Sequence, residues 1–140
     1  MTKEERQLLL VDLCARLPYG LKILHEGWNY EWDDELSTVE RVVGVDEDFI
    51  YTKVIDTHNG EEYRDGKHCI DLVDDKLFLR PMSSMTEEEK IDYRAFFNYD
   101  GVEYPDEYID WLNAHHFDYR GLIEKGLAIA VTEDNNPYKT

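Results

Sequence analysis

The chain has 140 residues, of which 42% are hydrophobic and 13% aromatic, and its 32 acidic and 15 basic residues give a formal net charge of −17. This length matches one domain with a sizeable core, which disfavours wholesale disorder. The acidic excess would repel phosphate backbones and anionic membrane surfaces, which disfavours direct nucleic-acid binding. A protein partner with a basic surface, or mimicry of a nucleic acid, is compatible with this charge.

A helix is predicted at the start of the chain. Thr2 and Glu5 have the spacing of a capping box, in which each side chain bonds a backbone amide beside the other residue. Leu9 and Leu13 then recur on one face, as in a helix that covers a core. Pro18-Tyr19-Gly20 is expected to end this helix.

Strands are predicted from residue 20 onward, because the period of apolar residues changes from about 3.6 to about two. Leu21, Ile23 and His25 fall on one side of the first strand. Residues 27–35, GWNYEWDDE, have no regular period and are predicted to form a long hairpin loop. The other predicted strands span 38–45 with a bulge at Gly44, then 49–55, and two extended segments between 61 and 81. The pattern favours a small, curled antiparallel sheet of four or five strands, similar to a partly open barrel.

Three helices are predicted after the sheet. Thr86 and Glu89 form a second capping-box pattern. Tyr104-Pro105 is expected to open the next helix, because proline is favoured at the first helical position. Asp118 is predicted to cap a third helix, and Gly126 to end it in a left-handed conformation.

The sequence therefore predicts a single α+β domain over residues 1–134. Residues 1–80 would supply the N-terminal helix and the sheet, and residues 81–134 would be mainly helical. Residues 127–133 are predicted to return to the sheet as a last strand, and 135–140 form a polar tail.

Two cysteines, Cys14 and Cys69, lie outside any C-x-x-C pair, and no secretory signal precedes them. Reduced, structural thiols in a cytoplasmic protein are the expectation for such a pattern. No apolar stretch reaches the length of a membrane span, so no membrane contact is predicted.

Three blocks of the sequence carry a resemblance to known proteins: LCARLPYGLK, LRPMSSMTEEEK and DWLNAHHFDYRGLIEKGLA. The chain resembles a family of small proteins encoded by prophages and mobile elements of gut anaerobes. The resemblance covers about a third of the chain and implies a habitat and a fold relationship. It brings no activity, catalytic residue or cofactor with it.

The most suggestive cluster for chemistry is His115, His116 and Asp118, because histidines and a carboxylate can bind a divalent metal or act as a base with its orienting partner. Neighbouring helical residues point about 100° apart, however, so both imidazoles do not face one ion within a regular helix. We therefore favour capping and packing roles for these residues. No metal, cofactor or catalytic residue is predicted.

Other candidate sites fit known patterns less well. His58, His68 and Cys69 lack further ligands at zinc-like spacing, and the acidic runs at 33–35, 46–48 and 74–75 lack the calcium-loop pattern. The sequence also lacks the phosphate-binding glycine motifs and the nucleophile elbow.

We therefore predict a non-enzymatic binding module, an accessory protein of a phage or mobile element. In the segment 27–35, aromatic side chains stand among acids, and such a surface would suit a partner with a basic surface. The predicted contacts are Trp28, Tyr30, Trp32, Asp33, Asp34 and Glu35. Two alternatives stay open: an acidic DNA mimic that inhibits a host DNA-binding protein or nuclease, and a small metal-dependent hydrolase at His115, His116 and Asp118.

Overall fold

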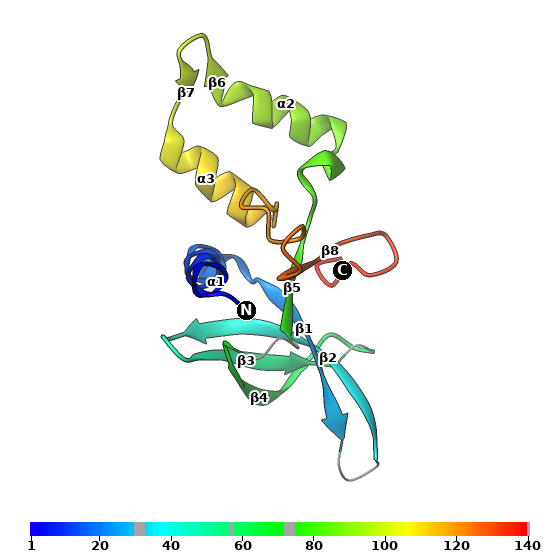
Figure 1. Ribbon diagram of the computed structural model, residues 1–140. Coiled ribbons are helices and arrows are strands. Elements are labelled where there is room, and N and C mark those ends of the chain that lie inside the picture. Colours follow the sequence, from blue (N-terminus) through cyan, green and yellow to red (C-terminus); the bar gives the residue numbers. More distant parts are fainter. Residues whose placement is uncertain (30–32, 57, 72–74, 140) are drawn as a thin grey trace.

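A computed structural model describes residues 1–29, 33–56, 58–71 and 75–139. Two parts stand out in Figure 1: a sheet with a helix beside it, and a helical arm that extends away from the sheet. The helices are α1 (Lys3–Arg16), α2 (Glu87–Ala95) and α3 (Pro105–Ala114), with short 3-10 turns η1 (Leu17–Tyr19) and η2 (Met82–Ser84). The strands are β1 (Lys22–Asn29), β2 (Asp34–Val45), β3 (Phe49–Ile55), β4 (Glu62–Cys69), β5 (Asp75–Leu79), β6 (Phe97–Asn98), β7 (Gly101–Val102) and β8 (Ala128–Ala130).

The main sheet has six strands in the order β4-β3-β2-β1-β5-β8. Neighbouring strands from β4 to β5 pair antiparallel, and β8 joins the edge parallel to β5. The α+β class, the N-terminal helix and the returning last strand were predicted and are confirmed, although the sheet is larger than expected. The register of β2 and β3 shifts between Val42 and Gly44, which confirms the predicted bulge.

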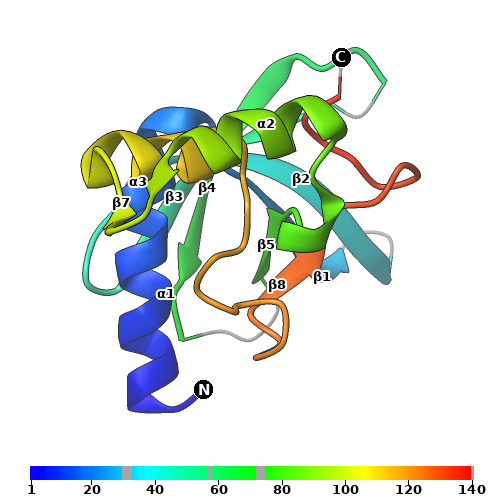
Figure 2. The same cartoon turned by 90° about the horizontal axis from the view of Figure 1, so that it is seen from above.

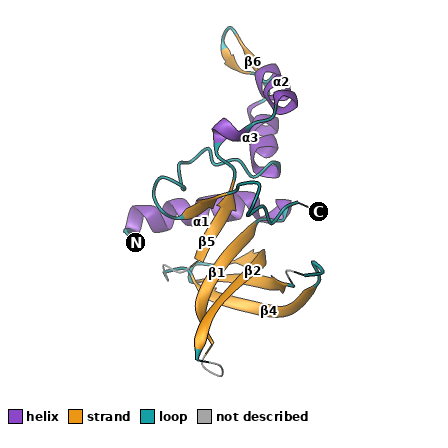
Figure 3. Cartoon of the chain, turned by 90° about the vertical axis from the view of Figure 1, so that its right-hand side faces the viewer, coloured by secondary structure: helices purple, strands orange, loops and turns teal. Residues whose placement is uncertain are grey.

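The long hairpin loop predicted over 27–35 is wrong in extent. Pairing of β1 with β2 continues through Gly27↔Leu36 to Asn29↔Asp34, so most of that segment is strand. Figure 3 shows these two strands extending past the others, where no helix covers them. The backbone pairing of these strands therefore continues although the sequence of the segment has no regular period.

The third C-terminal helix is also wrong. Residues after Asp118 form turns, and only α2 and α3 follow the sheet in the described part of the chain. Gly121 has φ of 76°, which interrupts any helix at its first turn. The predicted end signal holds nevertheless: Gly126 has φ of 74°, and the Leu127 amide donates to the Leu122 carbonyl at 3.0 Å.

The core lies between α1 and the sheet. Leu9 and Leu13 of α1 are buried against apolar side chains that alternate along the strands. Figure 2 shows α1 running beside the sheet, with α2 and α3 crossing above it. Cys14 points outward and is exposed, contrary to the expected structural role, and it is not bonded to Cys69. No helix among the described residues has the length and apolarity to cross a bilayer.

A buried ionic network fastens α1 to the segment that follows α3. Arg16 and Asp12 are both fully buried, and the Arg16 Nε donates to Asp12 Oδ2 at 2.8 Å. The Arg16 Nη2 also donates to the Phe117 carbonyl at 2.5 Å, and Arg120 Nη1 donates to the other Asp12 oxygen at 2.9 Å. A buried charge that loses its partner is costly, so α1 and residues 117–120 depend on each other.

Replacement of Asp12 by alanine should therefore destabilise the protein by about 3–5 kcal/mol, because it leaves the Arg16 guanidinium buried without its counter-ion. Asp12→Asn keeps one acceptor and should lose less. The measurement is the free energy of unfolding from urea titrations. The control is Asp71→Ala, which breaks the exposed Arg6–Asp71 pair and should change stability by about 1 kcal/mol or less. Equal losses in Asp12→Ala and Asp71→Ala would contradict the assigned role.

Candidate functional site

The interior face of the sheet is apolar near α1 and polar at its other end. Alternation along β1 puts His25 on the same face as buried Leu21 and Ile23. Alternation along β2 likewise puts Glu40 in line with buried Val42. Four titratable side chains meet at this polar end, and we call them the acid–histidine cluster: His25, Glu40, His68 and Asp75.

Glu40 lies at the centre of the buried hydrogen bonds. Its carboxylate is 1% exposed and accepts from Thr38 Oγ1 at 2.6 Å, from Thr52 Oγ1 at 2.5 Å and from His68 Nε2 at 2.6 Å. Burial acts to raise the pKa of Glu40, but the bonds from His68, Thr38 and Thr52 outweigh it and lower the pKa to about 2. Glu40 is therefore a fixed negative charge inside the sheet.

The two histidines of the cluster lie against each other. The rings of His25 and His68 stack with their centroids 4.1 Å apart. His25 Nδ1 bonds Asp75 Oδ1, and the register His25↔Asp75 of β1 and β5 sets these residues side by side. The bond to Glu40 raises the pKa of His68 above its ordinary value, against an opposing effect of burial. Solvent reaches the cluster through His25, whose side chain is 23% exposed.

Two glycines leave room around these side chains. A Cβ on Gly66 would stand 2.2 Å from Thr52 Oγ1 and 2.6 Å from Glu40 Oε1. Any side chain at this position would therefore displace the hydrogen bonds around Glu40. A Cβ on Gly27 would stand 3.1 Å from His25 Nε2. Neither glycine has a positive φ. The backbone therefore does not require glycine at these positions, but the space around the cluster does.

Sequence reasoning missed most of this cluster. His68 was considered only beside His58 and Cys69, whereas His58 is exposed in a turn and is not part of the cluster. The available signal was the strand period: His25 and Glu40 both occupy positions in phase with core residues. Charged or ionisable side chains at such positions are rarely buried without partners.

The structure separates the predicted cluster of His115, His116 and Asp118. Both carboxylate oxygens of Asp118 accept from backbone amides, of Leu122 at 2.9 Å and of Ile123 at 3.0 Å. Asp118 therefore holds a turn and does not cap a helix, because no helix follows it among the described residues. His115 stacks on Trp111 with centroids 4.4 Å apart, and its Nδ1 bonds the Trp111 carbonyl oxygen at 2.9 Å.

His116 has left-handed backbone, with φ of 62°, and its ring lies on Tyr138 at a centroid distance of 3.6 Å. The two rings help line an open groove of about 630 Å³. Burial, together with the positive charges of Arg16 and Arg80, lowers the pKa of His116 to about 4. His116 is therefore neutral at physiological pH and packs as an aromatic ring.

The structure describes the predicted contact residues of segment 27–35 only in part. Tyr30 and Trp32 lie outside the described residues. The backbones of Trp28, Asp34 and Glu35 belong to β1 and β2, and their side chains lie outside the description. Asp33 is exposed, with φ of 49°. A binding role for these six residues stays a prediction.

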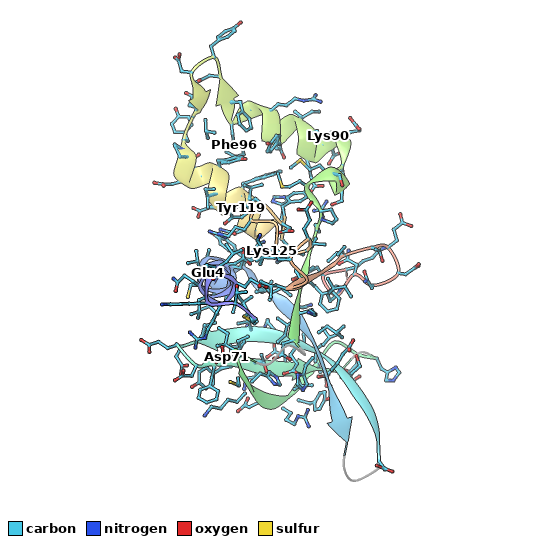
Figure 4. The ribbon with its side chains drawn as sticks, viewed as in Figure 1. Glu4, Asp71, Lys90, Phe96, Tyr119 and Lys125 are labelled. Atoms are coloured by element: carbon cyan, nitrogen blue, oxygen red, sulfur yellow. The ribbon has the colours of Figure 1, made fainter. Side chains whose placement is uncertain are left out.

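A second surface feature was not predicted: the arm of residues 86–114, formed by α2, β6, β7 and α3. Aromatic rings hold its two helices together, and Figure 4 labels Phe96, whose ring lies between them. The Phe96 ring lies 5.6 Å from that of Tyr108 and 6.0 Å from that of Trp111. Trp111 in turn stacks 5.6 Å from Phe117, which is fully buried. The arm is thus packed internally and is continuous with the domain core.

The end of the arm is exposed without interruption. Every residue from Phe97 to Glu107 is exposed, and we call this segment the tip. Its large apolar side chains are Phe97, Tyr99, Val102 and Tyr104, of which Tyr99 is fully exposed. Asp100, Glu103, Asp106 and Glu107 stand among them, and no lysine or arginine occurs between Arg94 and Arg120.

Comparisons of the chain with known protein families, with curated protein sequences and with solved structures found no match.

The pKa of His116 makes stability depend on pH in a defined direction. The folded-state pKa of about 4 lies below the ordinary value of 6.5, so the contribution of the neutral ring is complete above pH 6.5 and is lost as the pH falls toward 4. His116→Asn tolerates the left-handed backbone and removes this titration. The difference in unfolding free energy between wild type and His116→Asn should shrink by about 2 kcal/mol from pH 7 to pH 4. A difference that stays constant across this range would contradict a buried neutral imidazole.

Proposed function

We propose that this protein is a non-enzymatic binding module that docks the tip of its arm on a protein with a basic surface. The observation that carries the proposal is the unbroken exposure of residues 97–107, which bear four large apolar side chains and no basic residue. Single exposed apolar residues are common on protein surfaces, but a contiguous group with a polar rim is typical of interaction sites.

The tip has the chemistry of a binding hot spot. Tyrosine gives a large contact area with few rotatable bonds and is enriched where binding energy concentrates. Tyr99 stands at the hairpin turn and Tyr104 at the start of α3, and the two are 108% and 63% exposed. Burial of these rings in a recess on a partner would recover the hydrophobic free energy that their exposure forgoes.

Strand pairing and local hydrogen bonds support the backbone of the tip. Phe97 pairs with Val102 and Asn98 with Gly101. The Asn98 side chain accepts from the Asp100 amide at 2.9 Å, as in an Asx turn. Tyr104 has φ of 55° and precedes Pro105, which fixes the entry into α3. A preorganised loop loses less conformational entropy on binding, which favours affinity.

Charge decides the kind of partner. Residues 87–114 contain nine acidic and two basic residues, a net charge of −7. A second copy of the same arm would bring like charges together, so self-association through the tip is disfavoured. A partner with lysine and arginine around an apolar recess would be attracted to the rim and would bury the aromatic residues.

The experiment is site-specific photo-crosslinking in a lysate of the cells that carry the gene. Tyr99 is replaced by p-benzoylphenylalanine, and the matched control carries the same group at Tyr63, which is 60% exposed on β4. We expect an adduct with one discrete basic protein from position 99 that position 63 does not form. Adducts of equal yield at both positions, or adducts only between copies of this chain, would overturn the proposal.

Binding of the captured protein is then measured after it is purified. The double variant Phe97→Ser/Tyr99→Ser should weaken binding at least about 30-fold, the loss expected of a hot spot. Asp100→Asn/Glu103→Gln should reduce the dependence of the association rate on salt, because these carboxylates act at long range. The charge variant should keep the wild-type unfolding free energy to within about 1 kcal/mol. The Phe97 ring also contacts Tyr93 and Tyr108, so Tyr99→Ser alone is measured beside the double variant to separate binding from packing. Unchanged affinity in the first variant would exclude the tip as the contact.

The predicted contacts at 28–35 form a second contact region in this proposal. The ends of β1 and β2 extend from the side of the sheet opposite to the arm in Figure 1. The phage or mobile-element context rests on the sequence resemblance alone. DNA mimicry stays a prediction, since it requires carboxylates in a continuous row at phosphate spacing. The lysines and arginines interspersed along the chain do not favour such a row.

A further inference from the structure

Two imidazoles and a carboxylate converge at the polar end of the sheet interior. One ligand atom from each of His25, His68 and Asp75 lies within 4.8 Å of the other two. A tetrahedral ion with bonds of about 2.0–2.1 Å holds its ligand atoms about 3.3 Å apart. Binding of one ion therefore requires the ligand atoms to come closer, and the stacked rings of His25 and His68 must rotate until both lone pairs face the ion.

The nature of the donors selects the class of ion. Imidazole nitrogen with one carboxylate oxygen suits zinc and neighbouring divalent transition metals. Calcium and magnesium prefer sites made entirely of oxygen, in larger number than is available here among the described side chains. An ion can reach the site from solvent because the His25 side chain is 23% exposed. The Asp75 side chain is 5% exposed.

We propose that His25, His68 and Asp75 bind one divalent transition-metal ion of the zinc class, with Glu40 positioning His68 from behind. The three ligands come from β1, β4 and β5. β4 and β5 are consecutive in the chain, whereas β1 lies far from both in sequence and is separated from β4 in the sheet by β2 and β3. This site lies away from the arm, so the proposal does not rest on the protein-binding function.

Glu40 has the arrangement of a supporting carboxylate. Histidines that bind metals usually donate their second ring N–H to a carboxylate or carbonyl, which fixes the ring and its tautomer. The His68 Nε2 bonds Glu40 Oε1 at 2.6 Å, so Nδ1 is the nitrogen of this ring that would bind the ion. Glu40 is itself held by Thr38 and Thr52, so the orientation of His68 is fixed through two further hydrogen bonds.

Packing alone is a weak explanation for this cluster. Buried ion pairs contribute little net stability compared with apolar side chains of the same volume. Two acid–histidine pairs nevertheless occupy interior positions, and Gly66 leaves the space for one of them.

The test begins with the full-length chain after removal of metal by a chelator. Zinc chloride is titrated by calorimetry, and the histidine side chains are followed by ¹H–¹⁵N NMR. We expect one zinc ion per chain, with the imidazole signals of His25 and His68 shifted and those of His58, His115 and His116 unchanged. Calcium and magnesium chloride should give neither heat nor shifts. The NMR readout uses the wild type, so it does not depend on whether a variant folds.

Variants then separate the ligands from the supporting residue. His25→Ala and His68→Ala should each weaken zinc binding by at least about 100-fold, and Glu40→Gln by about 10–100-fold. The matched control is His58→Ala, which removes an exposed histidine outside the cluster and should leave the affinity unchanged. Absence of zinc binding to the wild type would overturn the proposal and leave the cluster as two structural ion pairs. Shifts confined to His115 and His116, or unchanged affinity in His68→Ala, would overturn it as well.

Discussion

The buried guanidinium of Arg16 is the constraint on which the rest of the architecture depends. It comes from the last turn of α1 and is fully buried, so it must find its counter-ion and its acceptors inside the protein. Asp12 supplies the charge from one helical turn earlier, and the Phe117 carbonyl supplies an acceptor from the other end of the chain. The helix that begins the fold is therefore joined to the segment that follows α3.

Phe117 extends this connection to the sheet and to the arm. The amide of Arg80, directly after β5, donates to the His116 carbonyl at 2.7 Å, and the Arg80 guanidinium lies 4.3 Å above the Phe117 ring. Arg80 also makes two bonds with Glu89 of α2, at 2.6 and 2.7 Å, which lower the pKa of Glu89 to about 2. One ring with its neighbouring backbone thus connects α1, β5 and α2. The base of the arm is fixed although its tip is exposed.

The sequence correctly predicted features that depend on hydrogen bonds between residues close together in the chain. The capping boxes at Thr2 and Thr86 and the left-handed Gly126 are confirmed, because each depends on hydrogen bonds between residues close in sequence. The prediction of a third helix was wrong because Gly121 has a left-handed conformation, which interrupts a helix. A capping residue such as Asp118 does not by itself make a helix. The prediction of a loop over 27–35 was wrong in extent because β1 and β2 pair there although their side chains show no regular period.

The acid–histidine cluster could not be predicted in full, because its members come from four strands. The position of Glu40 in phase with Val42 was readable, but its pairing with His68 required the register of β2, β3 and β4. The exposure of the tip could not be predicted from the sequence either. Tyr99 and Phe97 have the composition of core residues, and only the direction in which α2 leaves the sheet places them in solvent.

We expect a change at one of the two proposed sites to leave the other unaltered, because strand β5 lies between them. Asp75 begins this strand and Arg80 follows its end, so the metal ligand and the base of the arm stand about 17 Å apart along one extended segment. Hydrogen bonds to β1 on one side and β8 on the other fix the strand along its length. A paired strand does not lengthen or rotate when a side chain at one end moves by an ångström. Occupation of the cluster should therefore stabilise the sheet without altering the tip, and loss of the tip should leave ion binding intact.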